Sequence, residues 1–120
     1  MPQKPTHLSE LEAAQTAIDA ERFTEAIALL EPLCAQNHAI AKSMLGVLYQ
    51  VGAGVSTNGA LAVSLLKSAA EQGIGLAAHN LGTIYITGLP GVAPDSNLAK
   101  HYYRLARDLG CQLAPSTFYD

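Results

Sequence analysis

Apolar residues recur along the chain with the period of an α-helix. Between residues 7 and 20 they follow the i, i+3, i+4 spacing of one helical face, at Leu8, Leu11, Ala14, Ala17 and Ile18. Similar spacing continues through the chain, and no stretch alternates between apolar and polar residues with the period of two that marks a strand. The pattern therefore predicts an all-α protein without a sheet.

The helical pattern is organised in repeats. Two copies of one unit occupy residues 39–73 and 75–110, and their first halves match at a constant offset, with Ala41, Leu45, Gly46, Tyr49 and Gly52 paired to Ala77, Leu81, Gly82, Tyr85 and Gly88. From the loops onward the offset grows by one residue, and the matched pairs are Gly54–Gly91, Leu61–Leu98, Ala62–Ala99, Ala69–Ala106 and Gly73–Gly110. A fixed period of this length indicates stacked supersecondary units.

Each unit reads as helix, loop, helix. We expect helices over 39–51 and 58–72 in one copy, and over 75–87 and 95–109 in the other. Gly52 and Gly88 stand where a helix ends in a left-handed residue. Asn58 and Asp95 are the residue types that cap a helix N-terminus.

A weaker unit precedes these copies over residues 7–37. Its Ala26, Leu29, Leu30 and Asn37 match Ala62, Leu65, Leu66 and Gly73. It lacks the Leu-Gly pair and the glycine-rich loop, and a tight turn is expected at residues 21–24 instead. Residues 1–6 are expected to be disordered.

Residues 111–120 are expected to form a tail or cap. A final hairpin leaves an apolar edge unless something covers it. Either Leu113, Phe118 and Tyr119 fold back over the last hairpin, or they reach another chain and form a homodimer.

Two glycines inside predicted helices indicate close helix packing. Glycine costs a helix interior about 1 kcal/mol relative to alanine, yet Gly46 and Gly82 occupy the same position in both copies. We expect a neighbouring helix to approach closely there, with Tyr49 and Tyr85 as the large side chains beside the contact.

The repeated motif Ala-x-x-x-Leu-Gly-x-x-Tyr-x-x-Gly, followed by Gly-Val and a helix with spaced alanines, resembles the Sel-one-like repeat (SLR) family. The resemblance covers residues 39–110, while residues 8–38 more loosely resemble a tetratricopeptide hairpin through Phe23–Ile27. It implies an α/α superhelical solenoid of about three hairpins, whose first (A) helices line a concave face. It also implies protein–protein interaction, typically as an adaptor or scaffold and not as an enzyme.

The register of the resemblance predicts which residues face the concave side. These are Leu11, Gln15, Ile18, Ile40, Ser43, Val47, Gln50, Leu76, His79, Thr83 and Ile86. Such a strip is mostly apolar and uncharged, which is typical of an interaction site. The alternative is that half of these residues pack between neighbouring A helices.

Composition narrows the class of protein. The 120 residues are 49% hydrophobic and only 14% charged, so the chain is one domain and not a disordered segment. A net charge of −3 argues against nucleic-acid binding. No apolar run is long enough to span a membrane and no secretory leader is evident, so we expect a cytoplasmic protein.

Candidate chemistry is sparse. The two cysteines form no C-x-x-C motif, and we expect Cys34 to be buried, whereas Cys111 is open to interpretation as an exposed thiol. Cys34 and His38 have metal-ligand spacing, but no second pair accompanies them. We therefore expect no metal site, no cofactor and no enzyme. An immunity or inhibitor protein that sequesters a toxin or enzyme is the alternative function, and a small-molecule-binding or catalytic domain is a weaker one.

Charge is unevenly distributed. Glu10, Glu12, Glu21 and Glu25 make the beginning acidic, and Lys100, Arg104 and Arg107 share one face of the last predicted helix. This asymmetry either steers a partner or favours head-to-tail stacking of chains. The alternative interpretation is an ordinary solvated helix face.

Overall fold

The computed structural model describes residues 8–119, and the disorder expected of residues 1–6 lies outside this range. The described chain contains six α-helices and one short 3-10 helix. They are α1 (Leu8–Asp19), α2 (Phe23–Ala35), α3 (Ala39–Val51), α4 (Gly59–Glu71), α5 (Gly75–Thr87), α6 (Ser96–Asp108) and η1 (Ser116–Phe118). Across residues 8–119 the only β pairing is one isolated bridge, so the predicted all-α class is confirmed.

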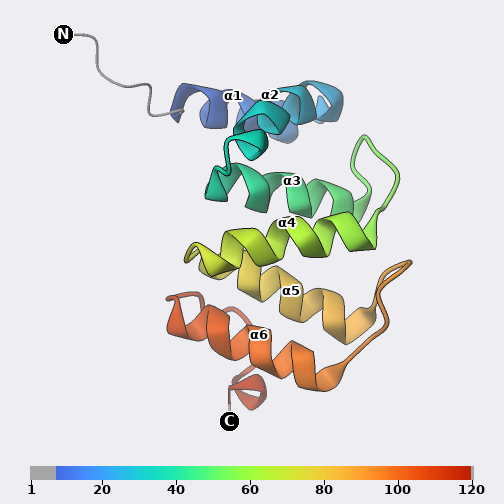
Figure 1. The fold of residues 1–120 in the computed structure, drawn as a ribbon, viewed down its shortest axis with the longest axis vertical. Helices are drawn as coiled ribbons and strands as arrows, with labels where there is room; N and C mark the ends of the chain where they lie inside the picture. Colours follow the sequence, from blue (N-terminus) through green and yellow to red (C-terminus); the bar gives the residue numbers. More distant parts are fainter. Residues whose placement is uncertain (1–7, 120) are drawn as a thin grey trace, which may run out of the picture.

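Consecutive helices pair as hairpins, and the hairpins stack along the long axis (Figure 1). Helices α1 and α2 lie at one end of the stack, and α6 and η1 at the other. Each hairpin joins the next through α2 against α3 and α4 against α5. The principal extents of 49 × 33 × 23 Å are those of an elongated stack. The architecture is an α/α solenoid of three hairpins.

The predicted capping residues begin α4 and α6 and end α3. The Asn58 side chain accepts a hydrogen bond from the Leu61 amide at 3.0 Å, and Asp95 accepts from the amides of Asn97 and Leu98. Gly52 has the left-handed conformation expected at a helix end, with φ 73° and ψ 35°. These caps satisfy backbone groups that a helix end leaves without partners.

Two details of the loops differ from expectation. Gly88 has a positive φ of 74° but an extended ψ of 165°, so it is not the predicted left-handed residue. It leads into the longer loop, where Leu89 and Val92 exchange backbone hydrogen bonds and turn the chain. The turn expected at residues 21–24 is shorter, because α2 already begins at Phe23.

The mid-helix glycines lie at close helix contacts, as predicted. A Cβ atom on Gly46 would lie 2.8 Å from Cγ of Leu66 on α4. On Gly82 it would lie 2.6 Å from Cδ1 of Tyr103 on α6. Both distances are too short for a carbon–carbon contact, so the absence of a side chain sets the spacing of these hairpins.

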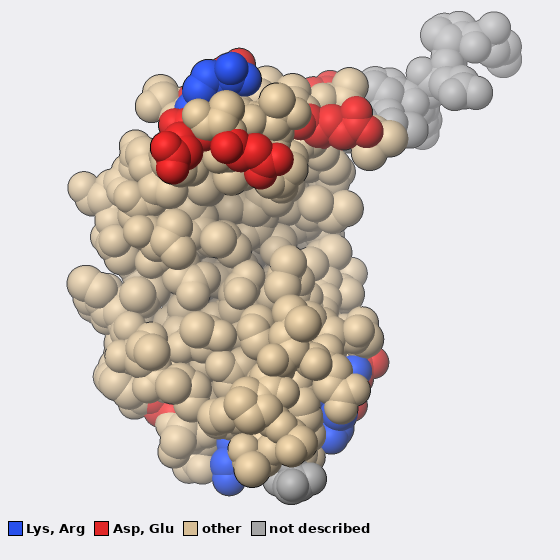
Figure 2. Space-filling model, turned by 180° about the vertical axis from the view of Figure 1, so that it is seen from behind, with Lys and Arg blue, Asp and Glu red and all other residues tan. Residues whose placement is uncertain are grey.

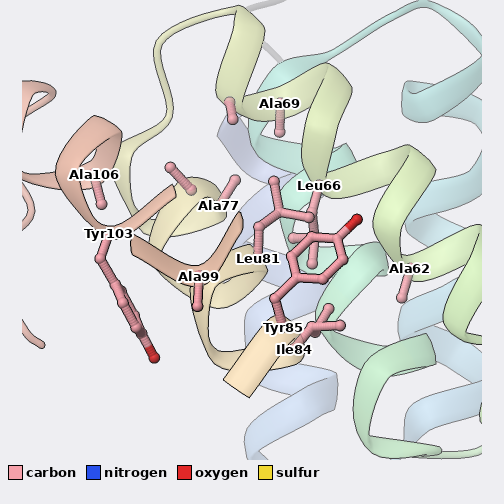
Figure 3. Packing of buried hydrophobic residues seen from close by; sticks show 12 residues of the cluster. Ala62, Leu66, Ala69, Ala77, Leu81, Ile84, Tyr85, Ala99, Tyr103 and Ala106 are labelled. Carbon is pink, nitrogen blue, oxygen red and sulfur yellow. The ribbon is translucent and has the colours of Figure 1, made fainter. Parts of the chain in front are cut away.

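Small residues also fill the interfaces around α5 (Figure 3). The fully buried alanines of this region are Ala62, Ala69, Ala77, Ala78, Ala99 and Ala106. Tyr85 is buried beside them, whereas Tyr49 is only half-buried. Alanine loses no side-chain entropy on burial, so close packing of these backbones costs little.

The buried side chains form two groups. One joins α1, α2 and α3, and the other joins α4, α5 and α6. Tyr49 packs against both groups. The border between the two groups therefore falls inside the α3–α4 hairpin and not between hairpins.

The C-terminal segment folds back onto α6. The Phe118 ring lies 4.8 Å from the Tyr103 ring, centroid to centroid. The Tyr119 hydroxyl accepts a hydrogen bond from the Ala114 amide at 2.9 Å, and Arg107 donates to the Tyr119 carbonyl at 3.1 Å. Leu113 departs from the expectation, because 66% of its surface is exposed. Phe118 and Tyr119 thus cover the last hairpin without Leu113.

Deleting residues 112–120 should expose apolar surface of α6 and promote aggregation. The deletion removes the Phe118 ring from Tyr103 and the Tyr119 carbonyl from Arg107. Dynamic light scattering and binding of a hydrophobic dye, compared with the full chain at equal concentration, measure the effect. An unchanged particle size and dye signal would show that the segment covers nothing that matters for solubility.

Both cysteines are free and half-buried. This corrects the expectation for Cys34, which is not fully buried, and places Cys111, for which exposure was left open, at an intermediate depth. Each packs at the edge of one of the two buried groups. Burial raises the pKa of the Cys34 thiol to about 11, with Lys42 nearby opposing the shift. Cys34 is therefore protonated near neutral pH and a poor nucleophile.

Candidate functional site

A groove crosses the A helices and contains a cavity of about 240 Å³. Its lining comes from α1, α3 and α5 and consists of Gln15, Ile18, Ser43, Met44, Val47, Leu48 and Leu76. Five of these seven belong to the predicted concave face, which did not include Met44 and Leu48. The groove is therefore an open, mostly apolar hollow on the face that the repeat register indicated.

The helix spacing explains why a hollow forms here. Helix α1 packs on α2, and α2 packs on α3, whereas α3 packs directly on α5. The hollow opens where α1 and α3 face one another across α2. Gln15 and Ile18 lie about one turn apart on α1, as do Ser43 and Val47 on α3, so each helix presents a short row to the same space.

Met44 and Leu48 form a second row on α3, one residue further round the helix than Ser43 and Val47. Leu48 is buried, with 3% of its surface exposed, and it forms part of the floor. The prediction followed a single row at i, i+4 and i+7. Met44 and Leu48 have the i, i+4 spacing of one helical face. Core residues of the chain show the same spacing, so the spacing alone does not mark these two as lining residues.

The remaining predicted residues lie elsewhere on the A helices. Ile40 and Ile86 are exposed, and Leu11, Gln50, His79 and Thr83 are half-buried. None of these six lines the cavity. Ser43 lines it but is only 6% exposed, so it is a floor residue and not the exposed contact that was expected.

His79 and Thr83 pack toward α6. The Thr83 hydroxyl lies 3.0 Å from the Tyr103 hydroxyl, and the His79 ring lies 5.3 Å from the Tyr103 ring. Burial lowers the pKa of His79, so the neutral imidazole is favoured. The His79 Nδ1 atom and the Gln50 Oε1 atom are buried without a hydrogen-bond partner. The His79 and Thr83 side chains therefore serve the packing of α5 on α6, which differs from the packing between neighbouring A helices that was the alternative interpretation.

The groove face is almost free of charge (Figure 2). Helix α5 contains no Asp, Glu, Lys or Arg, and α3 contains only Lys42, whose ammonium donates to the Ser68 hydroxyl at 2.8 Å. Acidic side chains predominate at the α1–α2 end, which also carries Arg22, and the opposite end carries Lys100, Arg104 and Arg107 together with Asp108. Within residues 8–119, no group of three or more His, Cys, Asp and Glu is placed to hold a metal ion.

The predicted basic patch is only partly available. Lys100 and Arg104 are exposed on α6. Arg107 is half-buried, donates to the Asp108 carboxylate at 3.1 Å and lies over the Tyr119 ring. Arg107 therefore helps to hold the C-terminal segment in place.

The fold and the groove define an α/α solenoid of the tetratricopeptide-like class. A model of the Sel1 repeat matches residues 39–74 and 75–111. The chain belongs to the Sel1 repeat family, as the resemblance in its sequence indicated. Repeats of this family generally act as protein–protein interaction modules and are typically non-catalytic.

Solved structures agree with this assignment. A Sel1 repeat protein from Oxalobacter formigenes is 31% identical, with a TM-score of 0.72, over 81% of this chain and 40% of that one. A protective antigen present in uropathogenic Escherichia coli strains, with an SLR fold, is 27% identical, with a TM-score of 0.74, over 84% of this chain and 22% of that one. The chain thus spans less than half the length of either relative. A search of the curated proteins finds no match.

The length and hydropathy of the helices decide whether one of them could span a membrane. None of the helices in residues 8–119 is long and apolar enough to cross a bilayer.

Proposed function

We propose that this protein is a small adaptor or scaffold that binds a partner protein through the groove of α1, α3 and α5. The observation that carries the proposal is the cavity of about 240 Å³, which has an almost wholly apolar lining on an uncharged face. An uncovered apolar surface of this kind is typical of an interaction site.

The dimensions of the groove favour side chains of a protein over a free small molecule. Pockets for drug-sized ligands measure about 300–1,000 Å³ and combine apolar walls with a few convergent polar groups. This cavity is smaller, and its polar groups are Gln15 and the Ser43 hydroxyl. A groove between helices instead suits anchor side chains of an amphipathic partner segment.

The proposed contact residues are those that line the cavity. Among the apolar lining residues, Leu76 is 49% exposed and Val47 is half-buried, so a partner can reach both. The exposed apolar residues Ile40 and Ile86 lie on the same helices and extend the contact. Thr83 is left out of the proposed contact because its hydroxyl pairs with Tyr103 inside the fold.

Leu76→Glu and Val47→Glu should each reduce partner capture by at least about tenfold. A new carboxylate in the groove must lose water when the partner binds, and a loss of about 1.4 kcal/mol already corresponds to tenfold. The measurement is quantitative pull-down from native lysate with mass spectrometry. Ser64→Glu, which adds the same charge to an exposed site on α4, is the matched control.

Circular dichroism must show that each variant keeps its helices. Undiminished capture by the folded Leu76→Glu and Val47→Glu variants would contradict the groove as the binding site. Stoichiometry then separates an adaptor from the alternative inhibitor role. An adaptor captures several proteins, whereas an immunity protein or inhibitor binds a single toxin or enzyme tightly and one to one.

A further inference from the structure

We propose that the groove selects a partner segment that combines apolar anchor side chains with a lysine or arginine directed toward α1. This inference rests on the proposed function and specifies the chemistry of the partner. It follows from two carboxylates beside the cavity, from the absence of lysine and arginine in α1 and α5, and from the volume and lining of the cavity.

The carboxylates belong to Glu12 and Asp19, which flank Gln15 on α1. Gln15 lines the cavity, and its Nε2 atom donates a hydrogen bond to Oδ1 of Asp19 at 2.8 Å. Glu12 lies three residues before Gln15, about one turn along the helix, and both acidic side chains are exposed. The α1 side of the groove therefore carries two negative charges next to an apolar floor.

The helices that line the groove offer these carboxylates little positive charge. Helices α1 and α5 contain no Lys or Arg. The single lysine of α3, Lys42, is hydrogen-bonded to Ser68 and Asn37. Figure 2 shows mostly acidic side chains, with a basic group among them, at that end of an uncharged face. Arg22, which follows α1, is paired there with the Glu25 carboxylate at 2.8 Å. Charges of one sign beside a low-dielectric groove favour a partner of the opposite sign and speed its association.

The cavity supplies the apolar half of the preference. An apolar cavity of about 150 Å³ is enough to hold a benzene molecule. The groove, at about 240 Å³, therefore has room for one branched or aromatic side chain. A charged side chain placed over Val47 and Met44 would lose its hydration without gaining an ion pair. The basic residue of the partner is therefore expected over α1 and the apolar residues over α3 and α5.

The experiment is selection of random twelve-residue peptides, displayed on phage, against the intact chain at low salt. Peptides that also bind the Leu76→Glu variant are removed. We expect the survivors to be enriched in Leu, Ile, Met or Phe together with Lys or Arg. Replacing that basic residue by Glu in a synthetic copy should weaken binding by about three- to tenfold in fluorescence anisotropy, and added salt should reduce the difference.

A charge swap identifies the carboxylates responsible. The double variant Glu12→Lys with Asp19→Lys should select peptides that carry Asp or Glu in place of Lys or Arg. The matched control is Glu31→Lys with Glu71→Lys, which makes the same change of charge on exposed sites of α2 and α4. The control should keep the preference of the unmodified chain, and circular dichroism should show both variants folded.

The outcomes separate this inference from the proposed function. Groove-dependent peptides without an excess of basic residues, or a preference that the swap leaves unchanged, would overturn the inference and leave the groove as a binding site. Peptides that bind regardless of Leu76→Glu, or a selection that yields none, would overturn both. Self-association of the chain in light scattering, lost in Leu76→Glu, would assign the groove to a second copy and overturn the inference as well.

Discussion

Gly82→Leu is expected to lower the free energy of unfolding by about 1–3 kcal/mol, because it forces side-chain atoms into a filled contact. A Cβ atom at this position would lie 2.6–2.9 Å from three atoms of the Tyr103 ring. Tyr103 is itself buried, lies against Phe118 and His79, and has its hydroxyl near that of Thr83. The ring cannot move aside without disturbing those contacts, so α5 and α6 must separate.

Urea denaturation followed by circular dichroism measures this effect. Gly82→Ala is the informative companion, since alanine is better than glycine by about 1 kcal/mol in an open helix. Combining Gly82→Ala with Tyr103→Ala removes the ring that the methyl group meets. The double variant should therefore be less destabilised than the sum of the two single variants. An unchanged midpoint for Gly82→Leu would show that the helices are not held at this spacing.

Leu66→Ala is expected to cost about 2–5 kcal/mol of stability, which is the usual range for deleting a buried leucine side chain. Leu66 is fully buried on α4 and meets Gly46 of α3 at the close contact between these helices. Because glycine has no side chain to move into the vacated space, the cavity cannot be filled from α3. A domain stable by only about 5–15 kcal/mol loses a large fraction of that stability.

The matched control for this substitution is Leu113→Ala. Leu113 is 66% exposed, so the same deletion of atoms should change stability by less than about 0.5 kcal/mol. Both variants are compared with the unmodified chain by urea denaturation. Equal losses for the two positions would contradict the burial that distinguishes them.

The helices of the second and third hairpins were predictable because the sequence contains two copies of the same repeat. The expected spans 39–51 and 75–87 agree with α3 and α5 to the residue, and the B helices differ by one residue at each end. In an alignment of the two copies, the matching residues are those that the fold requires, and the residues that differ are those that a single repeat tolerates. The close approach at Gly46 and Gly82 followed from the same alignment, because glycine inside two matched helices requires a packing reason.

What escaped prediction depends on contacts that have no counterpart in the other copy. Arg107 was assigned to a charged face, but the returning C-terminal segment gives it Tyr119 as a partner. Met44 and Leu48 were assigned to no site, although in the fold both line the cavity, with the buried Leu48 in its floor. Gly88 differs from Gly52 because its loop is one residue longer. The periodicity of the sequence indicates which residues share a helical face. The features named above depend on contacts between residues that are distant in the sequence, so periodicity does not predict them.

The border between the two groups of buried residues has a consequence for how the chain can be divided. Sequence repeats suggest cutting between hairpins, yet Ala41, Leu45 and Leu48 of α3 are buried with α1 and α2. Ala62 and Leu66 of α4, the other half of the same hairpin, are buried with α5 and α6. An excised α3–α4 hairpin would keep the close contact of Gly46 with Leu66 but lose the partners that its buried side chains have on α1, α2, α5 and α6. The repeated unit of the sequence is therefore the hairpin, whereas each group of buried side chains spans three helices, α1 to α3 or α4 to α6.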